Sequence, residues 1–293
     1  MNQAPAPTRV GLFGIGLDTY WPQFAGLKEK LLGHHATVAG RIAEAGTEVV
    51  DAGLVDTPEA ASGTGDRFRA ENVEIVFLFI TTYALSSTVL PVVQRAGVPV
   101  VVLNLQPVPQ LDYEAFNALG DRGAMTGVWL EHCQACCAPE IACVFNRAGI
   151  PFHQVVGHLE DETAWAELAE WVAAAGVRRA LRDNRMGVLG HYYGGMLDVY
   201  SDMTQQAAVF GNHFELLEMC ELHELRETVD PEAVAAKLDE FRRDFEVSEE
   251  CESEELERAA RTSVALDRLA EAHRLGALAY YYEGRSGNPY ENI

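Results

Sequence analysis

The sequence predicts an α/β fold made of two doubly wound, Rossmann-like (flavodoxin-like) domains with mostly parallel sheets. Short, continuously apolar runs, such as residues 75–80 and 98–103, alternate with longer segments of helical periodicity. Such runs are typical of parallel strands that helices cover on both faces. Glycines at positions 46 and 97 also end two helical segments directly before the next strand, as glycine past a helix end commonly does.

The first domain is expected to span residues 1–176, with strands and helices in strict alternation. This order implies βαβ units and a parallel sheet. We place the boundary near Gly176, where an alanine-rich helix is expected to end and the alternation restarts. The expected strands are residues 9–14, 48–52, 73–80, 98–103 and 151–156, and the expected helices are residues 26–45, 57–71, 87–96, 139–148 and 162–175, with a less regular piece around 113–129.

The second domain is expected to span residues 177–293. Its last residues, 290–293, look like the first turn of another helix, and this predicts that the domain is truncated at its C-terminal end. The expected strands are residues 185–190, 213–219 and 277–282, and the expected helices are residues 203–210, 231–245 and 254–275.

Composition excludes several classes of partner and compartment. The length of 293 residues suits two domains, and 48% hydrophobic with 23% charged residues is ordinary for a globular protein. A net charge of −22 argues against nucleic acid or an anionic membrane surface as partner, because both require a basic face. Six cysteines without a targeting segment predict reduced thiols and a cytoplasmic location.

The loop after the first expected strand disfavours a nucleotide site. A dinucleotide fingerprint would continue from Gly14 and Gly16 to a third glycine, but Thr19 occupies that position. The bulky residues that follow, Tyr20 and Trp21, would obstruct a pyrophosphate. An aromatic loop at the end of a parallel strand is instead a natural surface for a sugar ring or a neighbouring subunit.

The cysteine-rich segment predicts structural residues rather than a zinc site. Structural zinc usually needs two ligand pairs separated by a spacer, and here the second pair is missing. Pro139 is expected to start a helix, and cysteines near a helix start commonly serve as small buried residues. The residues concerned are His132, Cys133, Cys136, Cys137 and Cys143.

Two further strand ends carry groups that suit a ligand. The segment after the strand at 185–190 contains glycines that let a ligand approach the backbone, and His191 and Tyr192 could bond its hydroxyls, although a plain connecting loop is equally compatible. Glu283 follows the last expected strand, which should be buried. A carboxylate there is a candidate metal ligand or general base.

Together these segments resemble the L-arabinose/L-fucose isomerase family over essentially the whole chain. The resemblance implies two Rossmann-like domains followed by a barrel-type domain, and a divalent metal, commonly Mn²⁺, held by two glutamates and two histidines. It also implies conversion of an aldopentose or 6-deoxyhexose to its ketose through an enediol, within a homo-oligomer. The segments that carry it are GIGLDTYWPQF (residues 14–24), GHYYGGMLD (190–198) and YEG (282–284).

The resemblance also implies roles for individual residues. Glu283 matches the first family glutamate and would be both metal ligand and acid/base. Met196 falls near a substrate-contacting methionine of the family. Because family sites borrow residues from an adjacent subunit, the rim of the site would include Tyr20, Trp21 and Gln23.

Departures from the family pattern limit what this chain should do alone. The second glutamate and both metal histidines would lie beyond Ile293, and a first-domain histidine of arabinose-type members is replaced within residues 133–137. We therefore expect the chain alone to form no ketose with Mn²⁺. A non-catalytic sugar-binding α/β module remains open as an alternative, and a nicotinamide-dependent oxidoreductase is disfavoured by the loop at residues 14–19.

Overall fold

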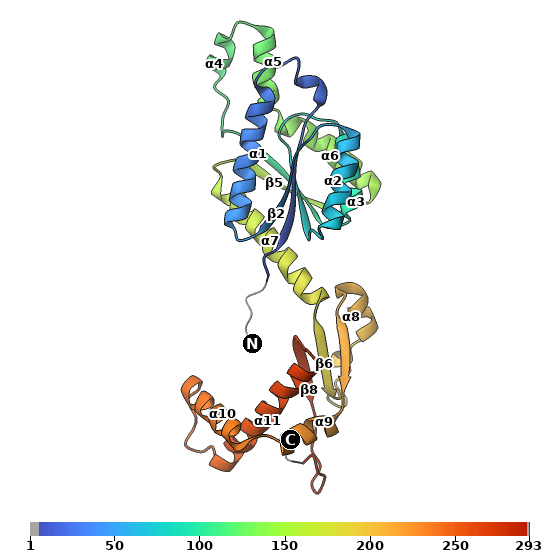
Figure 1. The fold of residues 1–293 in the computed structure, drawn as a ribbon, viewed down its shortest axis with the longest axis vertical. Helices are drawn as coiled ribbons and strands as arrows, with labels where there is room; N and C mark the ends of the chain where they lie inside the picture. The colour runs from blue at the N-terminus through green and yellow to red at the C-terminus, as the bar shows by residue number, and fades with distance from the viewer. Residues whose placement is uncertain (1–5, 292) are drawn as a thin grey trace. The chain divides into compact units, whose positions relative to one another are not determined.

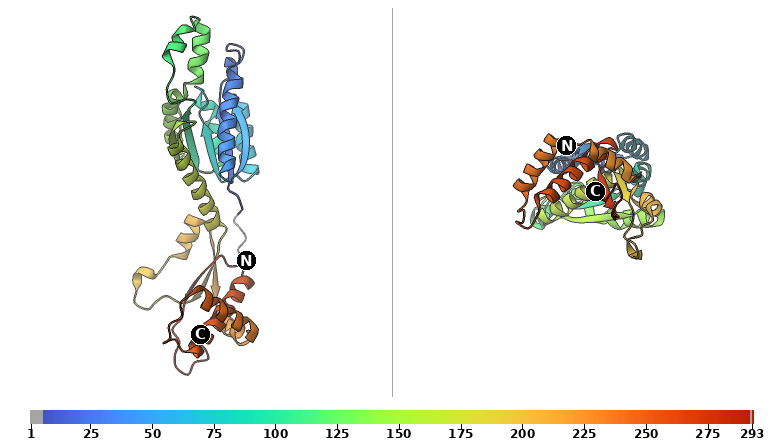
Figure 2. Two further views of the ribbon diagram at one scale, coloured as in Figure 1. Left: turned by 90° about the vertical axis from the view of Figure 1, so that its left-hand side faces the viewer. Right: turned by 90° about the horizontal axis from the view of Figure 1, so that it is seen from below.

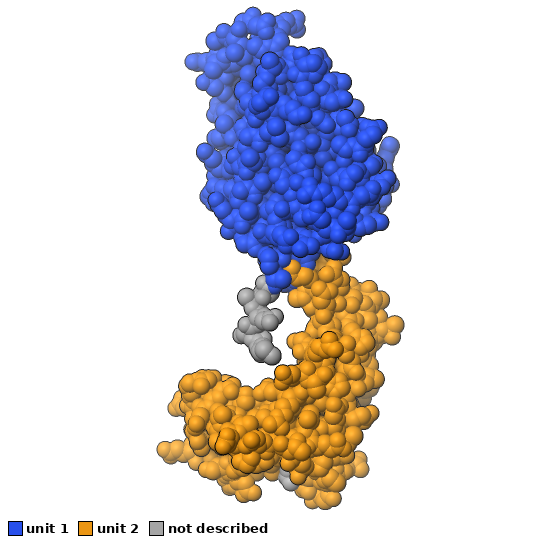
Figure 3. All heavy atoms as spheres, in the orientation of Figure 1, with its two compact units in different colours: residues 1–177 blue, residues 178–293 orange. Residues whose placement is uncertain are grey.

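The computed structural model describes residues 6–291 and 293, and it divides the chain into two compact units (Figure 3). Unit 1 comprises residues 1–177 and unit 2 residues 178–293. Each unit contains one parallel sheet with helices packed against it, so the predicted α/β class with mostly parallel sheets is confirmed. No helix within these described ranges is long and apolar enough to cross a membrane.

The sheet of unit 1 has five strands in the order β2-β1-β3-β4-β5, and all its pairings are parallel. This is the flavodoxin-like order, in which the winding direction reverses between β1 and β3. The strands are β1 (Arg9–Ile15), β2 (Glu48–Val55), β3 (Ile75–Phe79), β4 (Val100–Gln106) and β5 (Phe152–His158).

Helices cover both faces of this sheet (Figure 1). On one face, Val10 and Phe77 pack with residues of α1 (Leu27–Glu44) and α7 (Glu162–Arg182). The opposite face carries Phe13 and Val76, which pack with residues of α2 (Pro58–Ala70), α3 (Leu90–Ala96) and α6 (Gln134–Ala148). Two further helices, α4 (Tyr113–Ala118) and α5 (Arg122–Glu131), stand beyond the carboxyl edge of the sheet (Figure 2).

Two helix boundaries in unit 1 differ from the sequence-based expectation. Pro139 does not start α6 but lies inside it, since the helix begins at Gln134. Burial of Gln134 and Cys137 holds this additional turn in place despite the hydrogen bond that proline removes. Similarly, α7 does not end near Gly176 but continues to Arg182, because one glycine costs a helix only about 1 kcal/mol.

Unit 2 contains a parallel sheet in the order β7-β6-β8. Its core packs side chains of one sheet face, such as Leu189 and Leu217, against Leu222, Val264 and Leu269 of the helices. The elements are β6 (Arg185–Gly190), α8 (Met203–Phe210), β7 (His213–Leu217), α9 (Met219–Glu227), α10 (Pro231–Asp244), α11 (Ser253–Ala272) and β8 (Ala277–Tyr281).

Two expectations for unit 2 are wrong. The strand β7 ends at Leu217, and the unpredicted helix α9 follows at once. The strand β8 is not buried, because Tyr280 lies at an open edge and is 38% exposed. Residues 290 and 291 lie in a turn, and the Ile293 N–H donates to the Tyr290 oxygen at 3.2 Å, while residue 292 lies outside the description.

Close packing of α2 on α3 yields a first prediction. A Cβ at Gly65 would lie 2.7 Å from the Val92 carbonyl oxygen, whereas one at Gly63 would meet nothing within 4 Å. We expect Gly65→Ala to destabilise unit 1 by about 1–3 kcal/mol through overpacking. Gly63→Ala, in the same helix, should leave the stability of unit 1 unchanged or increase it by up to about 1 kcal/mol.

Urea unfolding followed by tryptophan fluorescence measures this difference. All four tryptophans, at positions 21, 129, 165 and 171, lie in unit 1, so the signal reports that unit alone. Equal midpoints for the two variants would contradict the close packing of α2 on α3.

Candidate functional site

The carboxyl edge of the unit 1 sheet is the first candidate position for a ligand. In this strand order the loops after β1 and β3 leave toward opposite faces, which opens a crevice where ligands commonly bind. The aromatic loop predicted for sugar contact follows β1 here. It contains Tyr20, Trp21 and Gln23.

Tyr20 and Trp21 are packed against the protein rather than presented to solvent. Their rings meet edge-on with centroids 6.4 Å apart, and both pack against a buried cluster that contains Leu27, Leu31 and Leu130. The indole N–H of Trp21 donates to Asp56 Oδ2 at 2.8 Å. In unit 1 these two side chains therefore fix the loop to its neighbours, with only part of each ring accessible.

Gln23 lines a cavity of about 410 Å³ that we call the unit 1 cavity. The cavity lies between this loop, the start of α1 and the helix α5. Its charged lining residues are Lys30, Asp121 and Glu131, and small residues of α5 complete the wall. Sequence analysis did not identify Lys30 and Glu131 as site residues, because they are 101 residues apart in the sequence and only the fold brings them together.

Glu131 is a buried carboxylate, only 9% exposed, that hydrogen bonds from Lys30 and His34 hold in its charged form. Lys30 Nζ lies 2.7 Å from Oε2, and His34 Nε2 lies 3.2 Å from Oε1. Burial by itself would raise the pKa of Glu131, but hydrogen bonds from His34 and Lys30 and the charge of Lys30 outweigh it and lower the pKa to about 2. The unit 1 cavity therefore keeps a charged carboxylate in its wall at neutral pH.

The carboxyl edge of the unit 2 sheet is the second candidate position. Gly190 ends β6 with φ of 88°, and a Cβ there would lie 1.9 Å from the Tyr281 carbonyl oxygen. Only glycine permits this close approach of β6 to β8. The next residue, His191, donates its backbone N–H to the same oxygen at 3.0 Å, and its ring packs edge-on against the Tyr281 ring.

His191 lines a cavity of about 420 Å³ at this edge, which we call the unit 2 cavity. Tyr282 also lines this cavity. So do Glu218 and Cys220, two residues that sequence analysis did not identify. Glu218 follows β7 directly, so a correct strand end at Leu217 would have placed it beside His191. The apolar part of the lining includes Val188, Leu216, Leu217 and Met219.

The other predicted residues of unit 2 do not line this cavity. The Tyr192 ring packs on Tyr200, with centroids 5.4 Å apart, and Met196 is 44% exposed in the same loop. Glu283 lies in the exposed segment after β8. Partial burial, and then the charge of Glu283, raise the pKa of Tyr281, which places this carboxylate close to the strand end.

The described residues do not by themselves fit a metal centre. No group of three or more histidine, cysteine, aspartate or glutamate side chains among them is arranged to hold a metal ion. Glu283 therefore has no converging ligands within this part of the chain. The expectation that the helix-start cysteines are buried holds for Cys133 and Cys137 but is wrong for Cys136 and Cys143, which are exposed.

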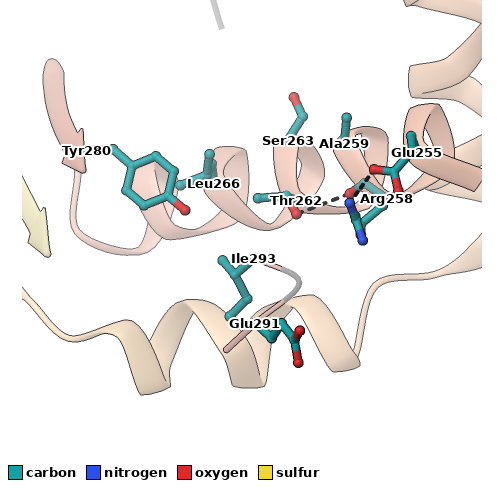
Figure 4. A pocket seen from close by; sticks show the side chains of 9 residues that line it. All are labelled: Glu255, Arg258, Ala259, Thr262, Ser263, Leu266, Tyr280, Glu291 and Ile293. Atoms are coloured by element: carbon teal, nitrogen blue, oxygen red, sulfur yellow. Dashed lines mark hydrogen bonds and ion pairs between the residues drawn. The ribbon is translucent and has the colours of Figure 1, made fainter. Parts of the chain in front are cut away.

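A third cavity, of about 450 Å³, lies between α11 and the end of the described chain (Figure 4). Tyr280, Thr262 and Ile293 point toward it, and Arg258 is paired with Glu255 on the same helix. None of the sequence-predicted site residues lines it.

The lowered pKa of Glu131 yields a second prediction. An acid whose pKa falls on folding stabilises the protein above its unfolded pKa, and this contribution is lost as the pH falls to the folded value. With an ordinary value of 4.5 and a folded value of about 2, the difference is worth about 3 kcal/mol. Glu131→Gln should therefore be less stable than wild type at pH 7 and approach it as the pH falls from 4.5 to 2.

Tryptophan-monitored urea unfolding across this pH range is the measurement, and Glu114→Gln in α4 is the control because Glu114 is exposed. The free energy of unfolding of Glu114→Gln should change with pH as that of wild type does. A constant difference between wild type and Glu131→Gln from pH 5 to pH 2 would rule out this role for the ion pairs.

Comparison with known proteins adds no assignment to these geometries. No protein-family model matches the chain, and no curated protein sequence matches it either.

Proposed function

We propose that the chain supplies the sugar-binding loops of a cytoplasmic, metal-dependent aldose–ketose isomerase of the L-arabinose/L-fucose isomerase family. The observation that carries the proposal is the unit 2 cavity, which lies where parallel strands of an open α/β sheet end. Its lining combines an imidazole, a carboxylate and a phenol with apolar side chains. Such a lining suits a monosaccharide, which presents hydroxyls at its rim and C–H groups on its faces.

The orientation of His191 supports its role in binding hydroxyls. Its Nδ1 lies 2.7 Å from the Tyr192 carbonyl oxygen, which can only accept a hydrogen bond. Nδ1 therefore carries the proton, and in the neutral ring Nε2 is left with a lone pair. That nitrogen can accept a hydrogen bond from a sugar hydroxyl, while the carboxylate of Glu218 can accept another.

Glu283 is the proposed acid/base of the isomerisation. A carboxylate can remove the proton on the carbon next to the carbonyl and return it to the adjacent carbon, which interconverts aldose and ketose through an enediol. Because the described residues near Glu283 do not form a metal centre, the proposal requires that further ligands come from elsewhere, such as other subunits of a homo-oligomer. A divalent ion such as Mn²⁺ would polarise the sugar oxygens there.

A non-catalytic sugar-binding module is the second candidate. The observation that favours it is that the polar lining of the unit 2 cavity includes His191, Glu218 and Tyr282 but not Glu283. Sugar binding in that cavity would need no metal. The two candidates therefore differ in how metal ions affect sugar affinity.

The third prediction tests sugar binding itself. His191→Ala should weaken binding of L-arabinose or L-fucose at least tenfold, or about 1.4 kcal/mol, because it removes a hydrogen-bonding group from the cavity wall. His213→Ala is the matched control, since His213 is exposed and lies at the start of β7, at the opposite edge of the same sheet. Isothermal titration calorimetry on the full chain measures both affinities.

Equal weakening in the two variants would exclude a specific role for His191. Absence of binding of both sugars to the wild-type chain would overturn the assignment of the unit 2 cavity as a sugar site.

The fourth prediction separates the two candidate functions. If Glu283 is a metal ligand, Mn²⁺ should tighten sugar binding by the wild-type chain, and Glu283→Gln should lose this increment while keeping the metal-free affinity. The control is Glu254→Gln, because Glu254 is exposed at the start of α11. An affinity that Mn²⁺ changes in neither wild type nor Glu283→Gln would support the binding module and contradict Glu283 as a metal ligand in this chain.

A further inference from the structure

We propose that Cys133 and Cys136 are a redox-active dithiol, which a small-molecule disulfide such as glutathione disulfide oxidises to an intramolecular disulfide. The two residues enclose the sequence Cys-Gln-Ala-Cys at the start of α6. A pair of cysteines at this spacing on a helix start is a known arrangement for thiol–disulfide exchange. This inference is independent of the proposed sugar site.

The backbone places the two side chains at disulfide spacing. Cys133 is the N-cap of α6, and the Cys136 N–H lies 3.3 Å from the Cys133 carbonyl oxygen, which closes the first turn. Residues three apart on a helix have Cα atoms about 5 Å apart. Disulfides span Cα separations of about 4.4–6.8 Å. The Cys136 side chain also lies within hydrogen-bonding reach of the Cys133 thiol.

The two thiols differ in accessibility, and this difference gives them different steps in the thiol–disulfide exchange. Cys136 is exposed, so a disulfide in solution can reach its sulfur. Cys133 is only 2% exposed and is protected from direct attack. Burial, and then the Cys136 thiol, raise the pKa of Cys133, so the first nucleophilic step falls to Cys136.

The exchange balances with one glutathione disulfide for each dithiol. The Cys136 thiolate attacks one sulfur of glutathione disulfide, forms a mixed disulfide, and releases one glutathione, which takes up the proton that Cys136 lost. Cys133 then loses its proton and attacks Cys136 Sγ, which breaks the mixed disulfide and releases the second glutathione. Two electrons pass from the protein to glutathione disulfide, and the protein loses two hydrogen atoms.

The neighbouring cysteines of α6 are poor alternatives. Cys137 is fully buried, and its thiol donates weakly to the carbonyl oxygens of Thr82 and Gln134 at 3.7 and 3.9 Å. Burial raises the pKa of Cys137 to about 11. Cys143 is exposed but lies two helical turns beyond Cys136, about 10 Å away along the helix, which is too far for a disulfide.

The oxidation can be followed directly on the full chain. The protein is incubated with glutathione disulfide and quenched with acid, the remaining thiols are alkylated, and the products are mapped by intact and tandem mass spectrometry. We expect a species lighter by two hydrogen atoms with a bond between Cys133 and Cys136, which reduced glutathione reverses. Cys136→Ser should abolish this species, Cys133→Ser should stop at a mixed disulfide on Cys136, and Cys143→Ser, the matched control, should behave as wild type.

Two results would overturn the proposal. One is a wild-type protein that accumulates glutathione on Cys136 while Cys133 remains free to be alkylated after denaturation. The other is a disulfide that joins Cys137 or Cys143 instead. Because Cys133 is buried, folding of Cys133→Ser is checked by tryptophan fluorescence. The wild-type protein and the Cys136→Ser variant carry no substitution in the core, so their disulfide maps test the proposal even if Cys133→Ser does not fold.

Discussion

Complete burial of β3 is the constraint on which unit 1 depends. All five of its residues are at most 1% exposed, and the strand pairs with β1 on one side and β4 on the other. Its side chains therefore need an apolar layer on each face, and the chain provides these layers with α1 and α7 on one side and α2, α3 and α6 on the other. Because helices must cross to both faces, the winding reverses beside β3, and the reversal opens the crevice at the carboxyl edge.

Unit 2 follows the same parallel design with less burial. The core packs on the sheet face that contains Leu189 and Leu217, whereas Leu216 on the other face is 69% exposed. The helix α8 contributes no buried side chain. Its cavity depends on the close contact between Gly190 and Tyr281, which fixes the start of the His191 loop. The proposed sugar contacts, His191, Glu218 and Tyr282, each follow the end of one of the three strands.

Several unusual side chains of unit 1 lie at the junction of α5 and α6. Glu131 ends α5 as a buried carboxylate, and Cys133 caps α6 only two residues later. Burial, and then Tyr83, Cys133 and Cys137, raise the pKa of Tyr20, so the two cysteines lie near the aromatic loop after β1. A disulfide at this junction would therefore form beside the loop that the family resemblance assigns to sugar recognition.

The sequence by itself determined the fold class and the order of its elements. Apolar runs are local signals, and they predicted all eight strands to within a few residues. It also identified His191 at a strand end, whereas the isomerase assignment remains a prediction. Only the tertiary structure decided that α6 begins before Pro139, that Glu131 pairs with Lys30 across 101 residues, and that Glu218 joins His191 in one cavity. These features depend on packing between distant segments, and such contacts leave no periodic pattern in the sequence.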